Sequence, residues 1–322
     1  MSIDAPDVSF IIAAFNAEET LRRAIDCALA QVGVAVEVVV VDDCSTDGTR
    51  AVAATYTDPR VRLICQPANG GPGRARNTGI AAARGCWVAT LDSDDAVYPD
   101  RLLSMLQRAG ATNAQVVVDN VDVVPLEGGT PTTMFPREQL LKQGELSLAD
   151  FIASNVIFQS SFNFGYMKPI FERDFLARHN LAFDETLKIG EDYILLASTL
   201  ASGARCAVDP NVGYIYHLRE GSISRVLKQH HLDAMLEADR RFLSRYTLSA
   251  PEMVAQRSRT SSILQAGSFL TLVDELKRKS LGGFLKTAIA DPRALTLLRM
   301  PLAARLHRLA KAVPGRRRVV AG

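Results

Sequence analysis

The strongest constraint on the fold is a series of apolar runs separated by helix-like segments. The runs cover residues 8–15, 36–41, 61–65 and 86–91. Between the first two, apolar residues from Leu21 onward recur at the spacing of one helix face. Continuous apolar strands that alternate with helices are typical of a parallel sheet covered on both faces. We therefore expect an α/β fold built on a mostly parallel sheet.

Carboxylates gather where two of these runs end. Asp42 and Asp43 follow the second run, and Asp92, Asp94 and Asp95 follow the fourth. Ligands bind at the carboxyl ends of the strands in such sheets, so we expect both groups at one edge. Neighbouring carboxylates repel each other, and a hard divalent cation held with a phosphorylated ligand would relieve that repulsion. The alternative is that these acids only cap helices or form turns.

Composition excludes several classes of protein. The formal net charge of +2 over 322 residues gives no overall field for binding nucleic acid. The five cysteines are scattered without a CxxC pair, which argues against a disulfide framework or a zinc site and favours a reducing compartment. The chain has no secretory signal pattern and no apolar stretch near the roughly 20 residues of a membrane span. We expect a cytoplasmic protein, at most attached to the inner face of the cell membrane.

Three further segments each allow a functional and a structural interpretation. The glycine-rich loop at 69–79 opens a helix and contains Arg76, so it either binds an anion or serves as a turn. Glu191 and Asp192 begin an apolar helix, where they either complement the positive helix end or supply a general base. His217 either ligates a metal, donates a hydrogen bond to a diphosphate, or has a structural role.

Together these segments resemble the large family 2 of inverting glycosyltransferases, which have the GT-A fold. The resemblance extends over about 220 residues in the family's order, which makes it more specific than any single motif. It implies a metal-dependent hexosyltransferase that uses a UDP-sugar donor and a saccharide acceptor. Relatives of this size often extend lipid-linked saccharides in the synthesis of bacterial exopolysaccharide or other surface polysaccharides. The matching segments are 8–16, 39–49, 69–79, 91–95 and 190–192.

On the nucleotide side, the resemblance assigns six residues. Ala13 to Phe15 would form the wall of the nucleobase pocket. The pair Asp42 and Asp43 would contact uracil, with Asp43 the preferred member, and Arg76 would lie near the nucleotide. Phe15 stands where many relatives have tyrosine, so ring stacking is retained and a hydroxyl contact is lost.

On the metal and acceptor side, the resemblance assigns four more. Asp92 would touch the ribose or the donor sugar. Asp94 would bind Mn²⁺ or Mg²⁺ that bridges the diphosphate, with Asp92 as a further candidate ligand. His217 stays a candidate ligand on the residues alone. Asp192 would be the catalytic base, with Glu191 alongside it.

The pattern becomes helical beyond residue 225. We place a catalytic domain at 1–225, with a nucleotide-binding half at 1–124 and an acceptor half at 125–225, and a helical extension at 226–322. In the extension, leucines between 295 and 309 interleave with arginines and lysines. Such a helix either rests on an anionic membrane surface or packs on the catalytic domain. The tail lacks aromatic residues that would stack on bases, so nucleic-acid binding is disfavoured.

Two other functions stay open at this point. A sugar nucleotidyltransferase would share the sheet and the acidic site, but it normally has a glycine-rich, basic signature after the first strand. In this chain the corresponding segment runs from Ala13 to Glu18 and contains neither glycine nor a basic residue, which argues against this function. A non-catalytic component that binds nucleotide sugars within a polysaccharide assembly is disfavoured by the presence of Asp92, Asp94 and Asp192.

Overall fold

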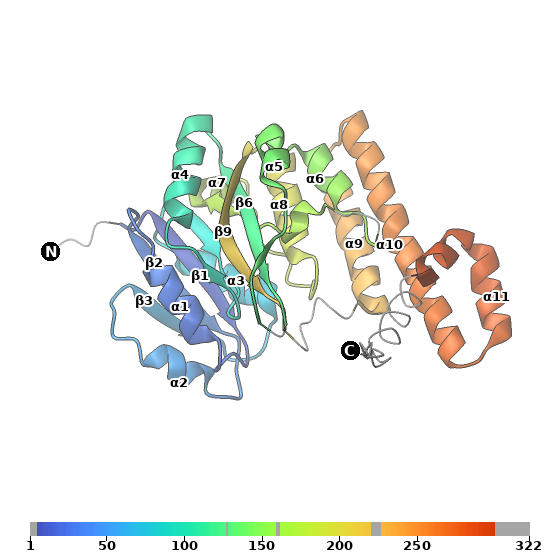
Figure 1. Cartoon of the computed structure of the whole chain (residues 1–322), viewed down its shortest axis with the longest axis horizontal. Helices are drawn as coiled ribbons and strands as arrows, with labels where there is room; N and C mark the ends of the chain where they lie inside the picture. Colours follow the sequence, from blue (N-terminus) through green and yellow to red (C-terminus); the bar gives the residue numbers. More distant parts are fainter. Residues whose placement is uncertain (1–4, 127, 159–161, 220–226, 300–322) are drawn as a thin grey trace, which may run out of the picture.

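The computed structural model describes residues 5–126, 128–158, 162–219 and 227–299 (Figure 1). Within these ranges, one nine-stranded sheet has the order β3-β2-β1-β4-β8-β6-β9-β5, and β7 pairs with β6. The strands are β1 (Val8–Ala14), β2 (Val36–Asp42), β3 (Val61–Cys65), β4 (Trp87–Thr90), β5 (Ala96–Val97), β6 (Val116–Val124), β7 (Thr132–Thr133), β8 (Ile170–Glu172) and β9 (Cys206–His217).

The first part of the sheet is parallel. β2 pairs with β1 and β3, and β1 also pairs with β4. In this register Ala14 lies beside Asp42 and Ile11 lies beside Thr90. The carboxyl ends of β1, β2 and β4 therefore meet at one edge of the sheet. The acidic segments that follow β2 and β4 share this edge, as their order in the chain predicted.

Antiparallel pairs enter where β8 inserts between β4 and β6. β9 runs parallel to β6, with register shifts around Asp119 and Asn120, and β5 pairs with β9 in the antiparallel sense. These pairs bring the end of β9 beside the segment that follows β4. The α/β fold is thus confirmed, with a parallel half of four strands and a mixed half.

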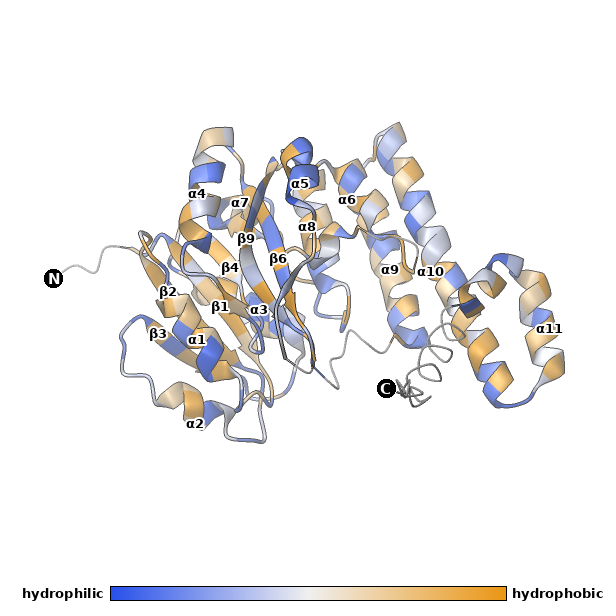
Figure 2. Cartoon of the chain, in the orientation of Figure 1, coloured by the Kyte–Doolittle hydropathy of each residue, from blue (hydrophilic) through white to orange (hydrophobic). Residues whose placement is uncertain are grey.

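Apolar cores lie on both faces of the sheet, because alternate residues of a strand point to opposite faces. In β1, Phe10 and Ile12 face the core that α1 (Leu21–Leu29) and α4 (Arg101–Thr112) cover. Ile11 faces the core shared with α3 (Pro72–Ala82), α6 (Leu148–Ser154) and α8 (Glu191–Ala201). Figure 2 shows β1 and β2 as hydrophobic along much of their length, as expected for strands covered on both sides.

Helices line both faces and then continue alone toward the C-terminal end (Figure 1). None of the helices in the described ranges is both long and apolar enough to cross a bilayer. The predicted division at residue 226 falls in a stretch outside the described residues. The remaining helical elements are α2 (Thr49–Ala54), α3 (Pro72–Ala82), α5 (Arg137–Gln143), α6 (Leu148–Ser154), η1 (Phe164–Tyr166), α7 (Arg173–Arg178), α8 (Glu191–Ala201), α9 (Gln229–Arg245), α10 (Ala250–Lys277), α11 (Leu281–Ala290) and η3 (Pro292–Leu298).

Candidate active site

A cavity of about 630 Å³ lies at the edge where β1, β2 and β4 end. Its walls come from the ends of β1 and β4, from the start of α3, from the start of α8 and from the segment around Lys168. Most of the predicted site residues meet here although they are up to 179 positions apart, from Ala13 to Asp192. The residues predicted for the site that line the cavity are Ala13, Phe15, Asp43, Arg76, Asp92, Asp94, Glu191 and Asp192.

The residues predicted to contact a nucleobase that line the cavity are Ala13, Phe15 and Asp43. The Phe15 side chain is half exposed, so its ring is open to a planar partner. Asp43 accepts hydrogen bonds from the backbone N–H groups of Gly70 and Gly71, each at 2.8 Å. Two N–H groups of the glycine-rich loop are therefore already paired with a carboxylate of this chain, which fixes the loop against the end of β2.

Asp42 points elsewhere. Its buried carboxylate accepts a hydrogen bond from Arg50 at 2.5 Å and two weaker ones from the backbone of Ser45. Asp42 is not among the residues that line the cavity. Of the acidic pair at the end of β2, Asp43 alone lines the cavity, and its contact with uracil stays a prediction.

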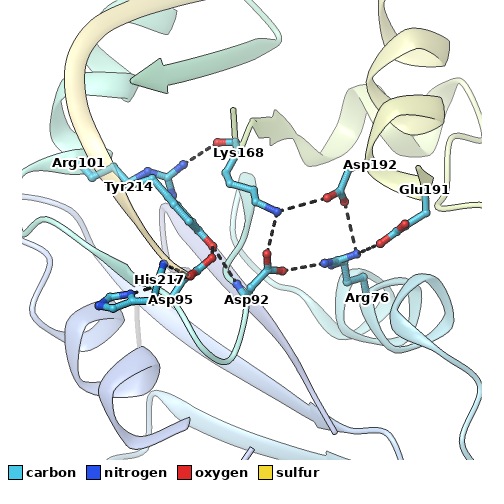
Figure 3. A network of polar contacts seen from close by, with 9 residues as sticks. All are labelled: Arg76, Asp92, Asp95, Arg101, Lys168, Glu191, Asp192, Tyr214 and His217. Carbon is cyan, nitrogen blue, oxygen red and sulfur yellow. Dashed lines mark hydrogen bonds and ion pairs between the residues drawn. The ribbon is translucent and has the colours of Figure 1, made fainter. Parts of the chain in front are cut away.

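Arg76 organises three carboxylates (Figure 3). It lies in the second turn of α3 with a side chain that is 8% exposed. Its guanidinium contacts Asp92 at 2.7 Å, Glu191 at 2.7 Å and Asp192 at 3.4 Å. The planar fork of arginine suits this task because its five N–H donors point in fixed directions. Arg76 thus joins the end of β4 to the start of α8.

The pKa values follow from burial and from these charges. Burial alone lowers the pKa of Arg76, but Asp192, Asp92 and Glu191 outweigh it and raise that pKa well above its ordinary value. Burial works to raise the pKa of Asp92, but Lys168 and Arg76 outweigh it, so that pKa lies well below its usual range. Burial raises the pKa of Glu191, and the charge of Asp192 adds to the effect.

Asp94 differs from its neighbours because it has less cationic compensation. Arg219 lies 3.8 Å from its carboxylate, and the side chain is about one-third exposed to the cavity. Burial raises the pKa of Asp94, and the charge of Asp92 raises it further. A bound cation would reverse this effect, so Asp94 is well suited to be a metal ligand.

Asp95 and His217 form a separate structural cluster beside the cavity (Figure 3). Asp95 accepts hydrogen bonds from the Tyr214 hydroxyl at 2.7 Å and from the His217 backbone N–H at 2.8 Å. Burial raises the pKa of Asp95 to about 8, helped by the charges of Asp92 and Asp94. The carboxyl of Asp95 therefore fastens the segment after β4 to β9.

His217 is not among the residues that line the cavity. Its Nδ1 atom is buried, has no hydrogen-bond partner among the described residues and lies 3.9 Å from Asp95. Burial lowers the pKa of His217, so its ring is neutral near pH 7. Its assignment as a metal ligand stays a prediction.

A divalent cation is compatible with the charges of the cavity. Its lining contains five carboxylates (Asp43, Asp92, Asp94, Glu191, Asp192) and four cationic side chains (Arg76, Lys168, Lys188, Arg219). A diphosphate would enter a site with no positive excess, and a divalent cation would supply the missing charge. No group of three acidic, histidine or cysteine side chains forms a ready-made metal site in the described ranges. Mg²⁺ in nucleotide sites commonly uses one or two carboxylates and takes further ligands from phosphate.

The sequence reasoning missed Lys168. Its Nζ lies 2.7 Å from Asp92 and 3.3 Å from Asp192 (Figure 3). The residue sits just before β8 in a segment with no clear periodicity, where a single lysine gives no signal. The pairing of β8 with β4 brings this segment to the cavity.

The comparisons with known proteins agree with this geometry. The model of glycosyl transferase family 2 matches residues 9–175, which include the strand ends described above. The chain belongs to glycosyltransferase family 2. It is therefore a glycosyltransferase, as the resemblance implied. The family match includes Asp43, Arg76, Asp92 and Asp94 and ends before Asp192.

Curated relatives extend the similarity over nearly the whole chain. The succinoglycan biosynthesis protein ExoO of Rhizobium meliloti (strain 1021) is 60% identical over 305 residues, which cover 95% of this chain and 87% of that protein. The succinoglycan biosynthesis protein ExoU of the same organism is 32% identical, over 92% of this chain and 86% of that protein.

Solved structures of distant glycosyltransferases show the same GT-A fold. S. aureus TarS in complex with UDP-GlcNAc has a TM-score of 0.65 at 21% identity, covering 87% of this chain and 79% of that one. The mannosyltransferase PcManGT from Pyrobaculum calidifontis, in complex with GDP-Man and Mn²⁺, has a TM-score of 0.60 at 17% identity. That match covers 94% of this chain and 81% of the other.

Proposed function

We propose that this glycosyltransferase transfers a hexose from a UDP-sugar to a hydroxyl group of a lipid-linked saccharide, with inversion at the anomeric carbon. The pathway would be bacterial exopolysaccharide synthesis of the succinoglycan type, carried out on the cytoplasmic side of the cell membrane. The similarity to ExoO and ExoU, both named for succinoglycan biosynthesis, supports the pathway.

One observation carries the proposal. A single cavity is lined by an open aromatic ring and a carboxylate at one end, Phe15 and Asp43, and by Asp94 and Asp192 elsewhere. The first pair suits a uracil ring, which can stack and donate its N3–H. In the second pair, Asp94 can bind a cation and Asp192 can accept the proton of the acceptor hydroxyl. These are the parts that transfer from a nucleotide sugar requires.

Each reacting bond has a residue to assist it. The acceptor hydroxyl gives its proton to Asp192 as its oxygen attacks the anomeric carbon. The bond from that carbon to the UDP oxygen breaks, and UDP leaves with the electron pair. Asp92 holds the sugar or ribose hydroxyls, and Arg76 keeps Asp92 and Asp192 at a fixed separation. Attack from the face opposite to UDP inverts the anomeric configuration.

Asp94, with Asp92 beside it, would hold Mn²⁺ or Mg²⁺. When bound, the cation offsets the charge that grows on the diphosphate as UDP departs. Asp94 is suited to this role because its carboxylate is less fully compensated by cations than that of Asp92.

The test is release of UDP from UDP-glucose, UDP-galactose and related donors, with Mn²⁺ and a lipid extract that contains the acceptor. Asp192→Asn and Asp94→Asn should each lower kcat by at least about 100-fold. Asp174→Asn is the matched control, because Asp174 is an exposed acid in α7 and does not line the cavity. It should keep the parent activity.

Three results would contradict the proposal. Full activity of Asp192→Asn would remove the assigned base. Formation of pyrophosphate from UTP and a sugar phosphate would show a nucleotidyltransferase instead. Tight binding of UDP-sugars without turnover on any acceptor extract would show a non-catalytic binding protein.

We also propose that the C-terminal helices rest on an anionic membrane surface, where a lipid-linked acceptor would be held. The predicted basic helix at 295–311 lies mostly outside the described residues, but α11 offers a second candidate. Leu281, Leu285 and Ile289 follow one another at intervals of four and are 75%, 58% and 79% exposed. Residues 277–299 contain six cationic residues and one acidic residue. An exposed apolar stripe with basic neighbours fits anionic lipid headgroups.

Sedimentation with vesicles tests this contact. The protein should bind vesicles that contain phosphatidylglycerol and not vesicles of phosphatidylcholine alone. Replacing Leu281, Leu285 and Ile289 by serine should weaken binding about tenfold or more. Serine at Val254 and Leu264, two exposed positions of α10, is the control and should leave binding unchanged. Equal binding by the triple variant would contradict the proposal, as would a solution dimer that the triple variant abolishes.

A further inference from the structure

Lys168 lies between the two acids with different proposed tasks. Its side chain is 15% exposed, and its Nζ contacts Asp92 on the donor side and Asp192 on the acceptor side. Asp92 follows β4 and Asp192 begins α8, so these two carboxylates come from elements 100 positions apart. Two carboxylates brought together in this way repel each other unless a cation separates them.

Arg76 and Lys168 close a four-membered ring of charges with these acids (Figure 3). Arg76 is shared with a third carboxylate, Glu191 at 2.7 Å, and its distance to Asp192 is 3.4 Å. Lys168 contacts Asp192 at a similar distance, 3.3 Å, from a different side of the carboxylate, since it pairs with the other oxygen. The orientation of the Asp192 carboxylate therefore depends on both cations.

The backbone of Lys168 is itself held in place. Its carbonyl accepts a hydrogen bond of 2.6 Å from Arg101. Arg101 is buried in α4 and donates two hydrogen bonds to the Asp119 carboxylate of β6, at 2.7 and 3.1 Å. Its guanidinium also lies 5.3 Å from the centre of the Tyr214 ring. A buried ion pair deep in the sheet thus fixes the point from which the lysine side chain reaches the cavity.

We propose that Lys168 is a positioning residue that holds the Asp192 carboxylate in its productive orientation relative to Asp92, and that Arg101 and Asp119 set the position of Lys168. The inference rests on the proposed role of Asp192 as the base. It predicts a larger effect on turnover than on donor binding, because Arg76 still contacts Asp92 at 2.7 Å when Lys168 is replaced. A misplaced base lowers the rate of the reacting complex, whereas the nucleotide contacts at Phe15 and Asp43 are unaffected.

The test compares Lys168→Met, which keeps an unbranched side chain, with Lys168→Arg, which keeps the charge. Lys168→Met should lower kcat about 10- to 100-fold while KM for the donor and the calorimetric affinity for UDP change less than about threefold. Lys168→Arg should recover most of the lost kcat. Glu37→Gln is the control, because Glu37 is a buried ion-paired acid at the start of β2, and the cavity lies where β2 ends. It should lower the unfolding temperature and leave kcat unchanged.

Asp119→Asn tests whether the ion pair of Arg101 and Asp119 sets the position of Lys168. It should lower kcat less than Lys168→Met does, and the two substitutions together should lower kcat no further than Lys168→Met alone. Unchanged kcat in Lys168→Met would overturn the inference. A large rise in donor KM at constant kcat would overturn it too, because the lysine would then bind the donor directly. Loss of activity in Asp192→Asn with full activity in Lys168→Met would reject the lysine's role alone and keep the proposed function.

Discussion

At the scale of single residues, Phe15 offers the clearest separation of binding from folding. Its ring lines the cavity and is half exposed, so it adds little to the core. Phe15→Ala should weaken UDP binding about tenfold or more, because stacking of an aromatic ring on a base is worth about 1–3 kcal/mol. Phe15→Tyr should retain the parent affinity. Calorimetry with UDP measures the effect.

The unfolding free energy provides the control for Phe15. Phe15→Ala should change it by less than about 0.5 kcal/mol, as expected for an exposed position. An unchanged affinity for UDP in Phe15→Ala would mean that the base binds elsewhere in the cavity.

Single residues also mark how far the sequence could predict the site. Asp43, Asp92, Asp94 and Asp192 could be found because they sit at strand ends or at a helix start in a recognisable order. Lys168 could not, because its partners are set by strand pairing and its own segment has no periodic pattern. The cluster of acids after the fourth run does not by itself separate Asp95, a structural acid, from its neighbours, whereas the family resemblance gave roles to Asp92 and Asp94 only.

At the scale of elements, Asp184 and Arg241 fasten α9 to the loop that precedes α8. Arg241 donates to the Asp184 carboxylate at 2.6 Å, and Thr186 donates two further hydrogen bonds. Burial works to raise the pKa of Asp184, but its hydrogen bonds with Thr186 and Arg241 outweigh burial and lower that pKa below its ordinary value of 3.8. A carboxyl whose pKa is lowered in the folded state stabilises the fold at pH values above its ordinary pKa. This contribution is lost as the pH falls through the pKa of the folded state.

Asp184→Asn should therefore lower the unfolding free energy by about 1 kcal/mol at pH 7, the upper range for a partly exposed ion pair. The deficit should shrink as the pH falls below 3.8 toward the lowered pKa of the folded state, because the native carboxyl becomes neutral there. Urea unfolding at pH 7, 5 and 3 measures it. The same deficit at every pH would contradict the ionic contribution.

Elements differ in how well the pattern predicts them. The four parallel strands appear where apolar runs predicted them. β1, β2 and β4 are mostly buried, and strands covered on both faces carry a strong signal, whereas β3 lies at the edge of the sheet and is only partly buried. β8 has three residues and β5 has two, and both are defined by their partners and not by local propensity.

At the scale of the whole molecule, the helices beyond residue 226 share a core with the earlier part of the chain. Phe242 of α9 and Ala255 of α10 belong to the same buried cluster as Phe151 and Leu195. Arg259 of α10 adds polar contacts, with a hydrogen bond to the Asn155 carbonyl at 3.2 Å. Removing these helices would expose the apolar faces of α6 and α8 to water.

A fragment of residues 1–225 should therefore lose cooperative unfolding, because the exposed core surface costs about 25 cal/mol for each Å². Urea titration followed by near-ultraviolet circular dichroism measures this. A fragment of residues 1–299 should unfold like the full chain. A cooperative transition of 1–225 at the parent midpoint would instead support an independent catalytic domain with the predicted boundary.

The most direct measurement of the central claim is a crystal structure of the protein with UDP and Mn²⁺. We expect uracil between Phe15 and Asp43, the diphosphate and the cation at Asp94, and the Asp192 carboxylate facing the space left for the transferred sugar. Electron density for UDP outside this cavity, or a cation bound away from both Asp92 and Asp94, would contradict the account.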